Sequence, residues 1–251
     1  MGAEQAVPVV MLHGQPATRV CWWPVKRLLN GVRVLDPDRP GYGFNRRPAT
    51  DFAGNVAWLL AMLDAEGVDR AVLAAHSWSA GVALLAAARH PDRVAGLALV
   101  APIGPHAVLT LDRVLAAPLA GEALSYAAVR LGGWWMRRRR LAEYRTYLDP
   151  EDLTAAGAEL DAQFARPLWR TFVVEQRALV HQLALLDGAL STVESPVRVV
   201  AGTEDPIIPR RTVQAIQRRV PAAVVSWVDG GGHELPLRSP GPVADAIGAL
   251  L

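Results

Sequence analysis

One serine stands in a sharp turn between an apolar strand and an Ala-rich helix. Residues 71–74 form a short apolar run, Ser77 lies in the motif AHSWSAG at 75–81, and a helical pattern follows over 78–89. Such a strand–turn–helix strains the backbone and lifts the serine hydroxyl clear of the sheet edge. The amides that open the helix face the same point. The sequence therefore predicts a nucleophile elbow with Ser77 at its tip.

The elbow departs from the usual G-x-S-x-G pattern at two positions. Ala75 and Ser79 stand where that pattern has glycine. Small residues are needed there because the turn is tight, and a side chain at position 79 can crowd it. The serine motif alone therefore does not decide the chemistry.

Two further motifs supply an acid and a base. GTEDPIIP at 202–209 follows a predicted strand at 197–200, and GGGHELP at 230–236 follows one at 224–228. Each motif begins where its strand ends. The chain order is serine, aspartate, histidine, which differs from the order in other serine-hydrolase folds.

The start of the chain predicts a loop that stabilises negative charge. A buried strand at 7–12 runs into HGQP at 13–16. Acyl transfer needs two backbone N–H groups aimed at the developing oxyanion, one from the residue after the nucleophile and one from this loop. The expected donors are the amides of Gln15 and Trp78. A further motif, DRPGYG at 38–43, follows a strand-like run and turns the chain sharply.

Together these motifs resemble the α/β-hydrolase superfamily, in its cap-bearing branch of bacterial esterases, cofactor-free haloperoxidases and carbon–carbon bond hydrolases. The resemblance covers nearly the whole chain. It implies a mostly parallel sheet flanked by helices and a catalytic triad of Ser77, Asp205 and His233. The family spacing favours Asp205 over its neighbour Glu204 as the acid. His13 and His76 are expected to be structural.

Members of this branch usually begin with a β-hairpin before the first motif. Few residues precede Val7 in this chain. We therefore expect the leading strands to be short or absent. An exposed sheet edge would result, and it favours a homodimer.

Periodicity divides the chain into a core and an insertion. Apolar runs alternate with amphipathic stretches as in a parallel α/β fold. A helix is predicted over 51–66, with Asp51 as its N-cap and Gly67 at its end, and the last helix over 243–251. After strand 94–102, which follows the nucleophile, the alternation stops. We predict a core of residues 1–102 and 192–251 with a helical cap at 103–191.

The cap is expected to choose the substrate, because an open α/β sheet binds its ligand beyond the carboxyl ends of the strands. Its aromatic side chains suit an apolar acyl group, and the alternative is that they pack the cap helices onto the core. The candidate pocket residues are Trp134, Trp135, Trp169 and Phe172.

Composition limits the partners and the compartment. The chain has 251 residues and a net charge of only +2, which gives no support to nucleic-acid binding. A lone Cys21 and the lack of a signal-peptide pattern at the start predict a cytoplasmic protein. Charged and proline residues interrupt the apolar region 94–136, so a membrane span is not expected. Leu131 to Met136 followed by four arginines leaves interfacial membrane contact as a less favoured alternative.

The leading hypothesis is a serine hydrolase that cleaves a small, largely apolar carboxylic ester through an acyl-enzyme, with no metal or organic cofactor. Perhydrolysis of the haloperoxidase type and carbon–carbon bond hydrolysis use the same triad and stay open. So does a non-catalytic protein of this fold that holds a ligand. Haloalkane dehalogenases and epoxide hydrolases need a carboxylate nucleophile, whereas position 77 is serine.

Overall fold

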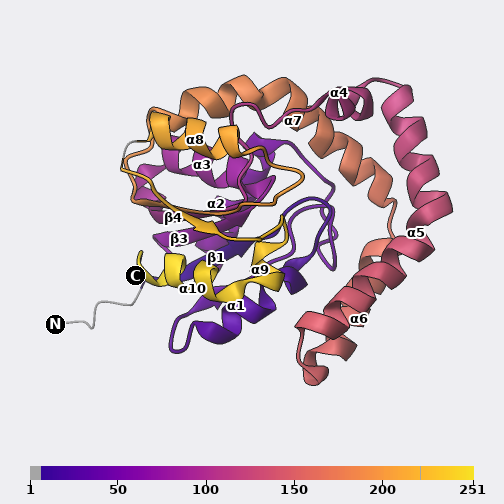
Figure 1. The fold of residues 1–251 in the computed structure, drawn as a ribbon, viewed down its shortest axis with the longest axis horizontal. Helices are drawn as coiled ribbons and strands as arrows, with labels where there is room; N and C mark the ends of the chain where they lie inside the picture. Colours follow the sequence, from indigo (N-terminus) through magenta and orange to yellow (C-terminus); the bar gives the residue numbers. More distant parts are fainter. Residues whose placement is uncertain (1–6, 221) are drawn as a thin grey trace.

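A six-stranded parallel sheet forms the centre of the computed structural model, which describes residues 7–220 and 222–251 (Figure 1). Across the sheet the strand order is β2-β1-β3-β4-β5-β6, and every neighbouring pair is parallel. The parallel α/β fold predicted from the sequence is therefore confirmed. The strands are β1 (Val9–Leu12), β2 (Val34–Leu35), β3 (Ala71–His76), β4 (Val94–Val100), β5 (Val197–Gly202) and β6 (Val224–Val228).

The central strands are apolar throughout because helices cover both faces of the sheet. In β3, Leu73 and Ala75 join one buried cluster, whereas Val72 and Ala74 join the cluster on the opposite face. Successive side chains in a strand point to opposite faces, so each strand contributes to both cores.

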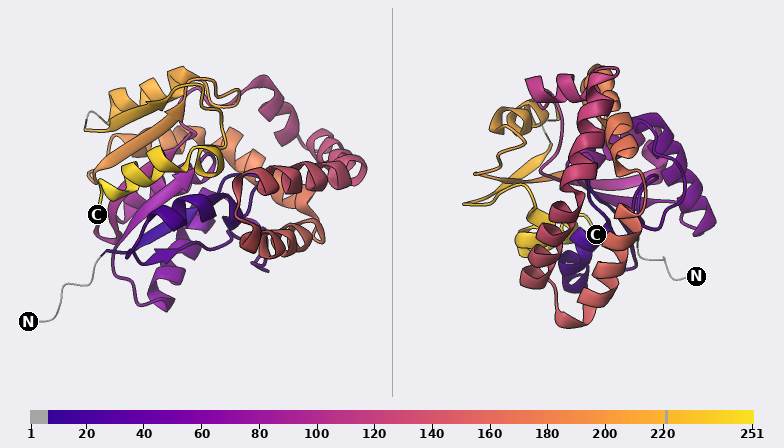
Figure 2. Two further views of the ribbon diagram at one scale, coloured as in Figure 1. Left: turned by 60° about the horizontal axis from the view of Figure 1, so that its bottom comes forward. Right: turned by 90° about the vertical axis from the view of Figure 1, so that its right-hand side faces the viewer.

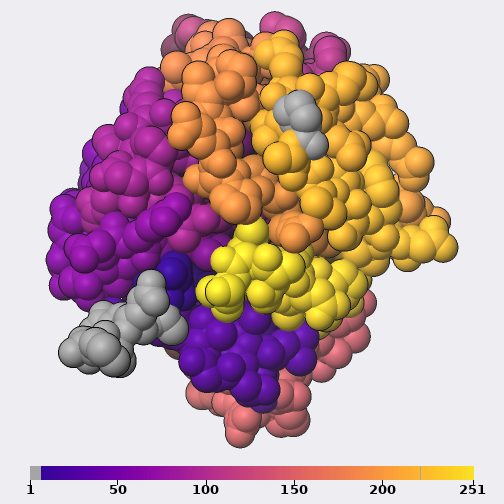
Figure 3. Space-filling view, turned by 90° about the vertical axis from the view of Figure 1, so that its left-hand side faces the viewer, coloured from indigo at the N-terminus to yellow at the C-terminus, as the bar shows by residue number. Residues whose placement is uncertain are grey.

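Two groups of helices cover the sheet. One face packs against α2 (Phe52–Ala65), α3 (Ser79–Arg89) and α8 (Arg210–Arg219), and the other against α1 (Trp23–Leu28) and α10 (Pro240–Gly248). Short helices connect them at η1 (Arg19–Trp22), η2 (Pro91–Arg93) and α9 (Leu235–Arg238). Figure 3 shows the C-terminal helix, in yellow, lying against the N-terminal part of the chain, in indigo.

The predicted start and end of α2 agree with the structure, whereas the predicted start of the last helix does not. The side chain of Asp51 accepts a hydrogen bond from the Gly54 amide at 2.9 Å and caps α2, and Gly67 has the positive φ of +63° expected after a helix end. The last helix, in contrast, was expected over 243–251 but begins three residues earlier. Pro240 is suited to a first turn because its amide has no hydrogen to satisfy.

Four helices lie between β4 and β5 in the chain, and we call them the cap: α4 (Thr110–Ala116), α5 (Ala120–Tyr147), α6 (Leu153–Phe164) and α7 (Leu168–Leu190), with η3 (Pro150–Asp152) before α6. Figure 2 shows α5 and α6 standing away from the sheet. The second half of α7 belongs to the core, because Leu186 and Leu190 join the buried cluster with α2 and α3. The division at residues 103 and 191 stays a prediction.

The sheet ends at a very short strand. β2 has two residues and forms the edge beside β1. Among the described residues no strand precedes β1. The prediction about leading strands falls partly on residues 1–6, which lie outside the described residues.

In the described part of the chain, no single helix is long and apolar enough to cross a bilayer. Helices α4 and α5 together have the length and the apolar composition of a membrane span, but the chain bends by 95° between them.

A buried carboxyl group lies where the cap meets the core. Glu159 on α6 is almost fully buried and pairs with Arg19 at 2.6 Å. Burial, and then the charge of Asp38, raise the pKa of Glu159 to about 7, because they outweigh the attraction of Arg19. The folded protein therefore holds a proton at Glu159 that the unfolded chain releases at lower pH.

This proton predicts a loss of stability as the pH rises. Between the ordinary pKa of glutamate, 4.5, and the folded value of about 7, unfolding releases the proton of Glu159, so rising pH favours the unfolded chain. We expect the unfolding midpoint of the wild type to fall relative to that of Glu159→Gln between about pH 5 and about pH 8. Thermal melts of both proteins at the two pH values measure this, and a constant difference would contradict it.

The loops after β5 and β6 approach each other closely. The Thr203 amide donates to Val228 O at 3.0 Å, and the Glu204 amide donates to Gly231 O at 2.9 Å. A Cβ at Gly202 would lie 2.1 Å from Gly231 O. Only glycine allows this contact at position 202.

Gly202→Ala should therefore destabilise the protein by about 2 kcal/mol or more, since the obstacle is backbone and not a flexible side chain. Gly232→Ala in the facing loop is the matched control, because a Cβ there meets nothing within 4 Å. Urea unfolding of the two variants measures the difference. Equal midpoints would show that the two loops are not tightly joined.

Candidate active site

The predicted elbow has the strained backbone that its motif requires. Ser77 has φ of +56°, in the left-handed region, and its amide donates to Val100 O on β4 at 2.9 Å. Ser79, where the motif usually has glycine, is fully buried. Its Oγ lies 2.6 Å from Leu12 O and 2.9 Å from His76 O, so its one hydroxyl hydrogen is shared between carbonyls of β1 and β3. The side chain therefore ties the elbow to two strands and does not crowd it.

The three residues of the expected triad meet at the carboxyl ends of three strands. His233 Nε2 lies 2.9 Å from Ser77 Oγ, and His233 Nδ1 lies 2.8 Å from Asp205 Oδ2. These are hydrogen-bond distances for a base that takes a proton from a hydroxyl while an acid orients it. Glu204, the alternative acid, does not contact His233 through a hydrogen bond and lines the neighbouring cavity.

The acid is held in its charged form. Asp205 Oδ1 accepts hydrogen bonds from the amides of Ile207 at 2.8 Å and Ile208 at 2.9 Å. Burial by itself would raise the pKa of Asp205, but the hydrogen bond and charge of His233, together with these amides, hold the pKa below its usual value. Asp205 can thus fix the orientation of the imidazole and stabilise it when it becomes charged.

Two unpaired amides lie beside the serine. Gly14 approaches the elbow so closely that a Cβ there would lie 3.0 Å from Ser77 Cβ and 2.9 Å from His76 Nδ1. This close approach brings the loop that carries Gln15 to the nucleophile. Within the described residues, neither the Gln15 nor the Trp78 amide donates to another protein group. Buried amides are nearly always paired, so free ones suit a ligand oxygen.

The two histidines predicted to be structural are buried and neutral. His13 donates from Nδ1 to Gly14 O and accepts the Arg39 amide at Nε2, each at 2.9 Å, and burial lowers its pKa to about 3. His76 donates from Nε2 to His233 O at 2.9 Å, and burial lowers its pKa to about 4. His13 shapes the amide-bearing loop, and His76 holds the backbone of His233.

A buried ion pair joins this loop to the cap, and sequence reasoning missed it. The guanidinium of Arg39 donates to His13 O at 2.8 Å and to Gly14 O at 3.2 Å, and it also pairs with Glu175 on α7. Both charged side chains are fully buried. Tyr42 Oη donates to Glu175 Oε2 at 2.6 Å, and Trp78 Nε1 donates to Glu175 O at 3.0 Å.

A weak signal for this pair was present in the sequence. Glu175 lies four residues after Thr171 and three before Ala178, on a face of α7 whose side chains are buried. A carboxylate on a buried face needs a partner. Arg39 in the DRPGYG motif is such a partner, but the pairing itself is not encoded by spacing.

A cavity of about 700 Å³ opens between the cap and the ends of β5 and β6. His233 lines it, and so do apolar side chains of the cap together with several charged ones. The lining includes Thr18, Trp135, Met136, Arg139, Arg140, Glu143, Tyr144, Leu160, Gln163, Phe164, Leu168, Ile207, Glu234 and Arg238.

Only one of the four expected pocket aromatics lines this cavity. Trp135 does so, whereas Trp134 is 68% exposed. Trp169 packs edge-on against Tyr126 with ring centroids 5.7 Å apart. Phe172 offers its carbonyl to Gln15 Nε2 at 3.0 Å and does not line the cavity. We correct the expectation accordingly: α5 and α6 wall the cavity with other residues, while the faces that carry these three aromatics turn elsewhere.

Metal binding has no candidate residues in the described part of the chain. No three side chains of histidine, cysteine, aspartate or glutamate there come close enough together to hold an ion.

Comparison with known proteins places this geometry in a family. Residues 9–246 match the model of the alpha/beta hydrolase family. The 2-hydroxymuconate semialdehyde hydrolase of Pseudomonas sp. (strain CF600) is 26% identical over 97% of this chain and 86% of its own length. Epoxide hydrolase A of Mycobacterium tuberculosis is 30% identical over 97% of this chain and 90% of its own length.

Solved structures agree on the fold. A thermophilic esterase from Thermogutta terrifontis superposes with a TM-score of 0.73 at 20% identity, covering 97% of this chain and 88% of that one. The relatives are enzymes named as hydrolases of small molecules. The chain belongs to the α/β-hydrolase family of enzymes.

Proposed function

We propose that the protein hydrolyses a small, largely apolar carboxylic ester through an acyl-enzyme on Ser77. One observation carries the proposal: hydrogen bonds run from Ser77 Oγ through His233 to Asp205, at 2.9 Å and 2.8 Å. The strained elbow and the two free amides beside it are the other parts that acyl transfer needs.

In the first step His233 Nε2 takes the proton of Ser77 as Oγ attacks the ester carbonyl carbon. The carbonyl oxygen becomes an oxyanion, which the amides of Gln15 and Trp78 stabilise. His233 then gives its proton to the departing alkoxide, so an alcohol leaves and the acyl group stays on Ser77. Asp205 stabilises the imidazolium between these two proton transfers.

In the second step water repeats the sequence. His233 takes a proton from a water molecule, and the resulting hydroxide attacks the acyl carbon. The ester bond to Ser77 breaks, Oγ regains a proton from His233, and a carboxylic acid is released. The three side chains, the two backbone amides and one water molecule complete this cycle.

The cavity supports the proposal of a small, largely apolar substrate. Its volume of about 700 Å³ suits a small molecule, and Leu160, Phe164, Leu168 and Ile207 supply apolar walls. Hydrolysis through an alkyl-enzyme ester requires a carboxylate that attacks an alkyl carbon. Position 77 is a serine and cannot supply that carboxylate. Attack on a carbonyl is the reaction that a serine hydroxyl performs.

Carbon–carbon bond hydrolysis of a diketone is the second candidate. The relative named 2-hydroxymuconate semialdehyde hydrolase matches along 97% of the chain and favours keeping it. The same three residues would serve, with the leaving group a carbanion instead of an alkoxide. The two candidates differ in substrate and not in nucleophile.

Replacing the nucleophile should abolish ester hydrolysis. We expect Ser77→Ala to lower kcat/KM for p-nitrophenyl esters at least about 1,000-fold, because the covalent route is lost. Asp205→Asn should lower it about as strongly, since the imidazole would take the wrong tautomer. Initial rates on esters of several chain lengths give both values.

Matched variants show whether these effects are specific. Ser191→Ala removes an exposed serine hydroxyl at the C-terminal end of α7 and should leave the rate unchanged. Glu204→Gln should lower it less than about tenfold, because Glu204 does not contact His233. Wild-type rates in Ser77→Ala would refute the assignment. A folded wild type that cleaves a vinylogous diketone but no ester would move the proposal to the second candidate.

A further inference from the structure

Helix α5 exposes large apolar side chains along one face. Leu131 is 88% exposed, Trp134 68%, Trp135 55% and Leu124 49%. Their spacing places them on a single stripe, because residues three, four and seven apart share one face of a helix. Exposed tryptophan and leucine in this density are unusual for the surface of a soluble domain.

The stripe is the outer face of a helix that is otherwise packed. Gly133 and Tyr144 are buried on the opposite side of α5, where the helix contacts α6 and α7. The right-hand view of Figure 2 looks onto α5 as the outermost element of the cap. The helix is thus held by the protein along one side and unpartnered, in the structure as described, along the other.

Basic residues continue the stripe. Arg138, Arg139 and Arg145 are exposed and form no ion pair with a carboxylate of the described residues. The guanidinium of Arg138 stacks on Trp134 at 4.6 Å, and that of Arg139 on Trp135 at 5.4 Å. In contrast, the neighbouring Arg137 pairs with an acidic residue of α6, and Arg140 pairs with one of α5 and with the N-cap residue of α9.

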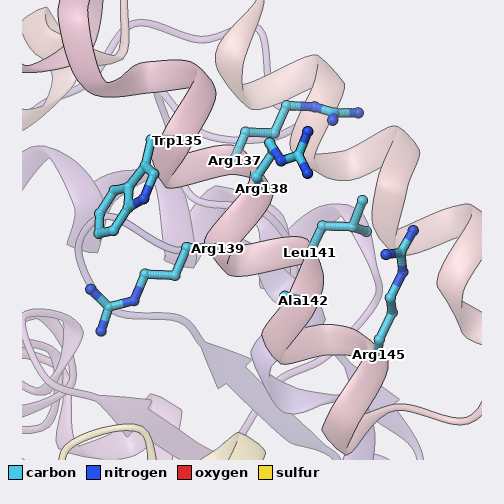
Figure 4. A pocket seen from close by; sticks show the side chains of 7 residues that line it. All are labelled: Trp135, Arg137, Arg138, Arg139, Leu141, Ala142 and Arg145. Carbon is cyan, nitrogen blue, oxygen red and sulfur yellow. The ribbon is translucent and has the colours of Figure 1, made fainter.

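A shallow cavity lies among these side chains. It has a volume of about 500 Å³ and is lined by Trp135, Arg137, Arg138, Arg139, Leu141, Ala142 and Arg145. Figure 4 shows Trp135 and Arg139 on one side of α5, with Arg138 and Arg145 on the other. The ring of Trp135 therefore stands next to three arginines that form no ion pair with the described residues.

The charge of this surface selects its partner. In a two-fold dimer through this face, the patch with Arg138, Arg139 and Arg145 would meet its own copy, and like charges in contact repel. A bilayer with anionic lipids supplies what the surface lacks: phosphates for the guanidinium groups and an interfacial layer in which tryptophan rings are stable.

We propose that α5 docks the enzyme on an anionic phospholipid surface, with the helix lying in the plane of the interface. Leu131, Trp134 and Trp135 enter the boundary between headgroups and acyl chains, and Arg138 and Arg145 bind lipid phosphates. The buried side of α5 keeps its contacts with the cap, so docking needs no unfolding of the helix.

Docking at this face also bears on the active site. Trp135 and Arg139 line both the shallow cavity and the larger cavity that reaches His233. The docked surface is therefore continuous with the mouth of the active-site cavity. This step rests on the proposed ester hydrolysis: an apolar ester dissolved in the membrane would reach the cavity without crossing water.

Vesicle cosedimentation tests the docking without requiring catalysis. The full chain carrying Ser77→Ala, which consumes no lipid by the proposed mechanism, is spun with phosphatidylcholine vesicles with and without phosphatidylglycerol. We expect binding to the anionic vesicles, weak binding to the neutral ones, and a fall in binding as salt is added. No sedimentation with anionic vesicles at low salt would overturn the proposal.

Surface variants locate the contact. Arg138→Glu with Arg145→Glu changes the local charge by four units and should weaken binding about 100-fold or more. Leu131→Ser with Trp134→Ser should weaken it about tenfold or more through lost apolar burial. Trp227→Ser with Arg210→Glu is the matched control, because this pair stacks at 4.7 Å between α8 and β6 and lines neither of the two cavities beside α5. The control should bind as the parent does.

Further outcomes distinguish anionic docking from its alternatives. Binding that is equal on neutral vesicles and insensitive to salt would overturn the anionic contact. Concentration-dependent dimerisation that is lost in Leu131→Ser with Trp134→Ser, without vesicle binding, would assign the face to a second copy. In proteins that keep Ser77, none of these surface substitutions should change the rate on a soluble ester, because none of the replaced residues lines the cavity at His233. Vesicle binding by a protein without esterase activity would uphold the docking and refute only the proposed function.

Discussion

The site depends on a left-handed backbone at a single residue, Ser77. A φ of +56° costs about 1–3 kcal/mol for a residue with a side chain and persists only where neighbouring elements hold it. Here the hydroxyl of Ser79 ties the elbow to β1 and β3, and the amide of Ser77 bonds to β4. Because three adjacent strands fix the turn, the serine oxygen has one position, and His233 meets it at hydrogen-bond distance.

The second constraint is the burial of Arg39 and Glu175. Removing two charges from water costs several kcal/mol for each, and only their pairing and the additional hydrogen bonds offset it. The partners come from different parts of the chain: Arg39 follows β2 and holds the Gly14 carbonyl, whereas Glu175 belongs to α7 of the cap. The loop that offers the Gln15 amide and the first half of α7 therefore form one unit. A change in the cap at Glu175 would therefore alter the support of the Gly14 carbonyl through Arg39.

The sequence predicted those parts of the molecule that local rules determine. A parallel sheet brings its strand ends to one edge, so the residues after three of its strands were expected to meet. The motifs and the family resemblance identified Ser77, Asp205 and His233 among them. The capping role of Asp51 at the start of α2 could be predicted as well, because its partner is a backbone amide close by in the sequence.

Contacts between distant segments could not be predicted in the same way. Helix α5 has apolar residues on more than one face, and periodicity does not say which face meets the core. Trp134 was expected to line the pocket, but its side chain is exposed to solvent. The role of Ser79 depended on two carbonyls that a tight turn brings near. Glu159 acquires its pKa of about 7 because folding buries it and places it beside Asp38, 121 positions earlier in the chain.

The central claim is that Ser77 becomes covalently acylated. Peptide mapping by mass spectrometry after exposure to a fluorophosphonate probe tests it most directly, because such a probe is captured only by a hydroxyl with an active base beside it. We expect one adduct per chain, on the peptide that contains Ser77, and none on Ser79 in the same peptide. A folded, ester-cleaving protein that carries no adduct, or carries it on another residue, would rule out Ser77 as the nucleophile.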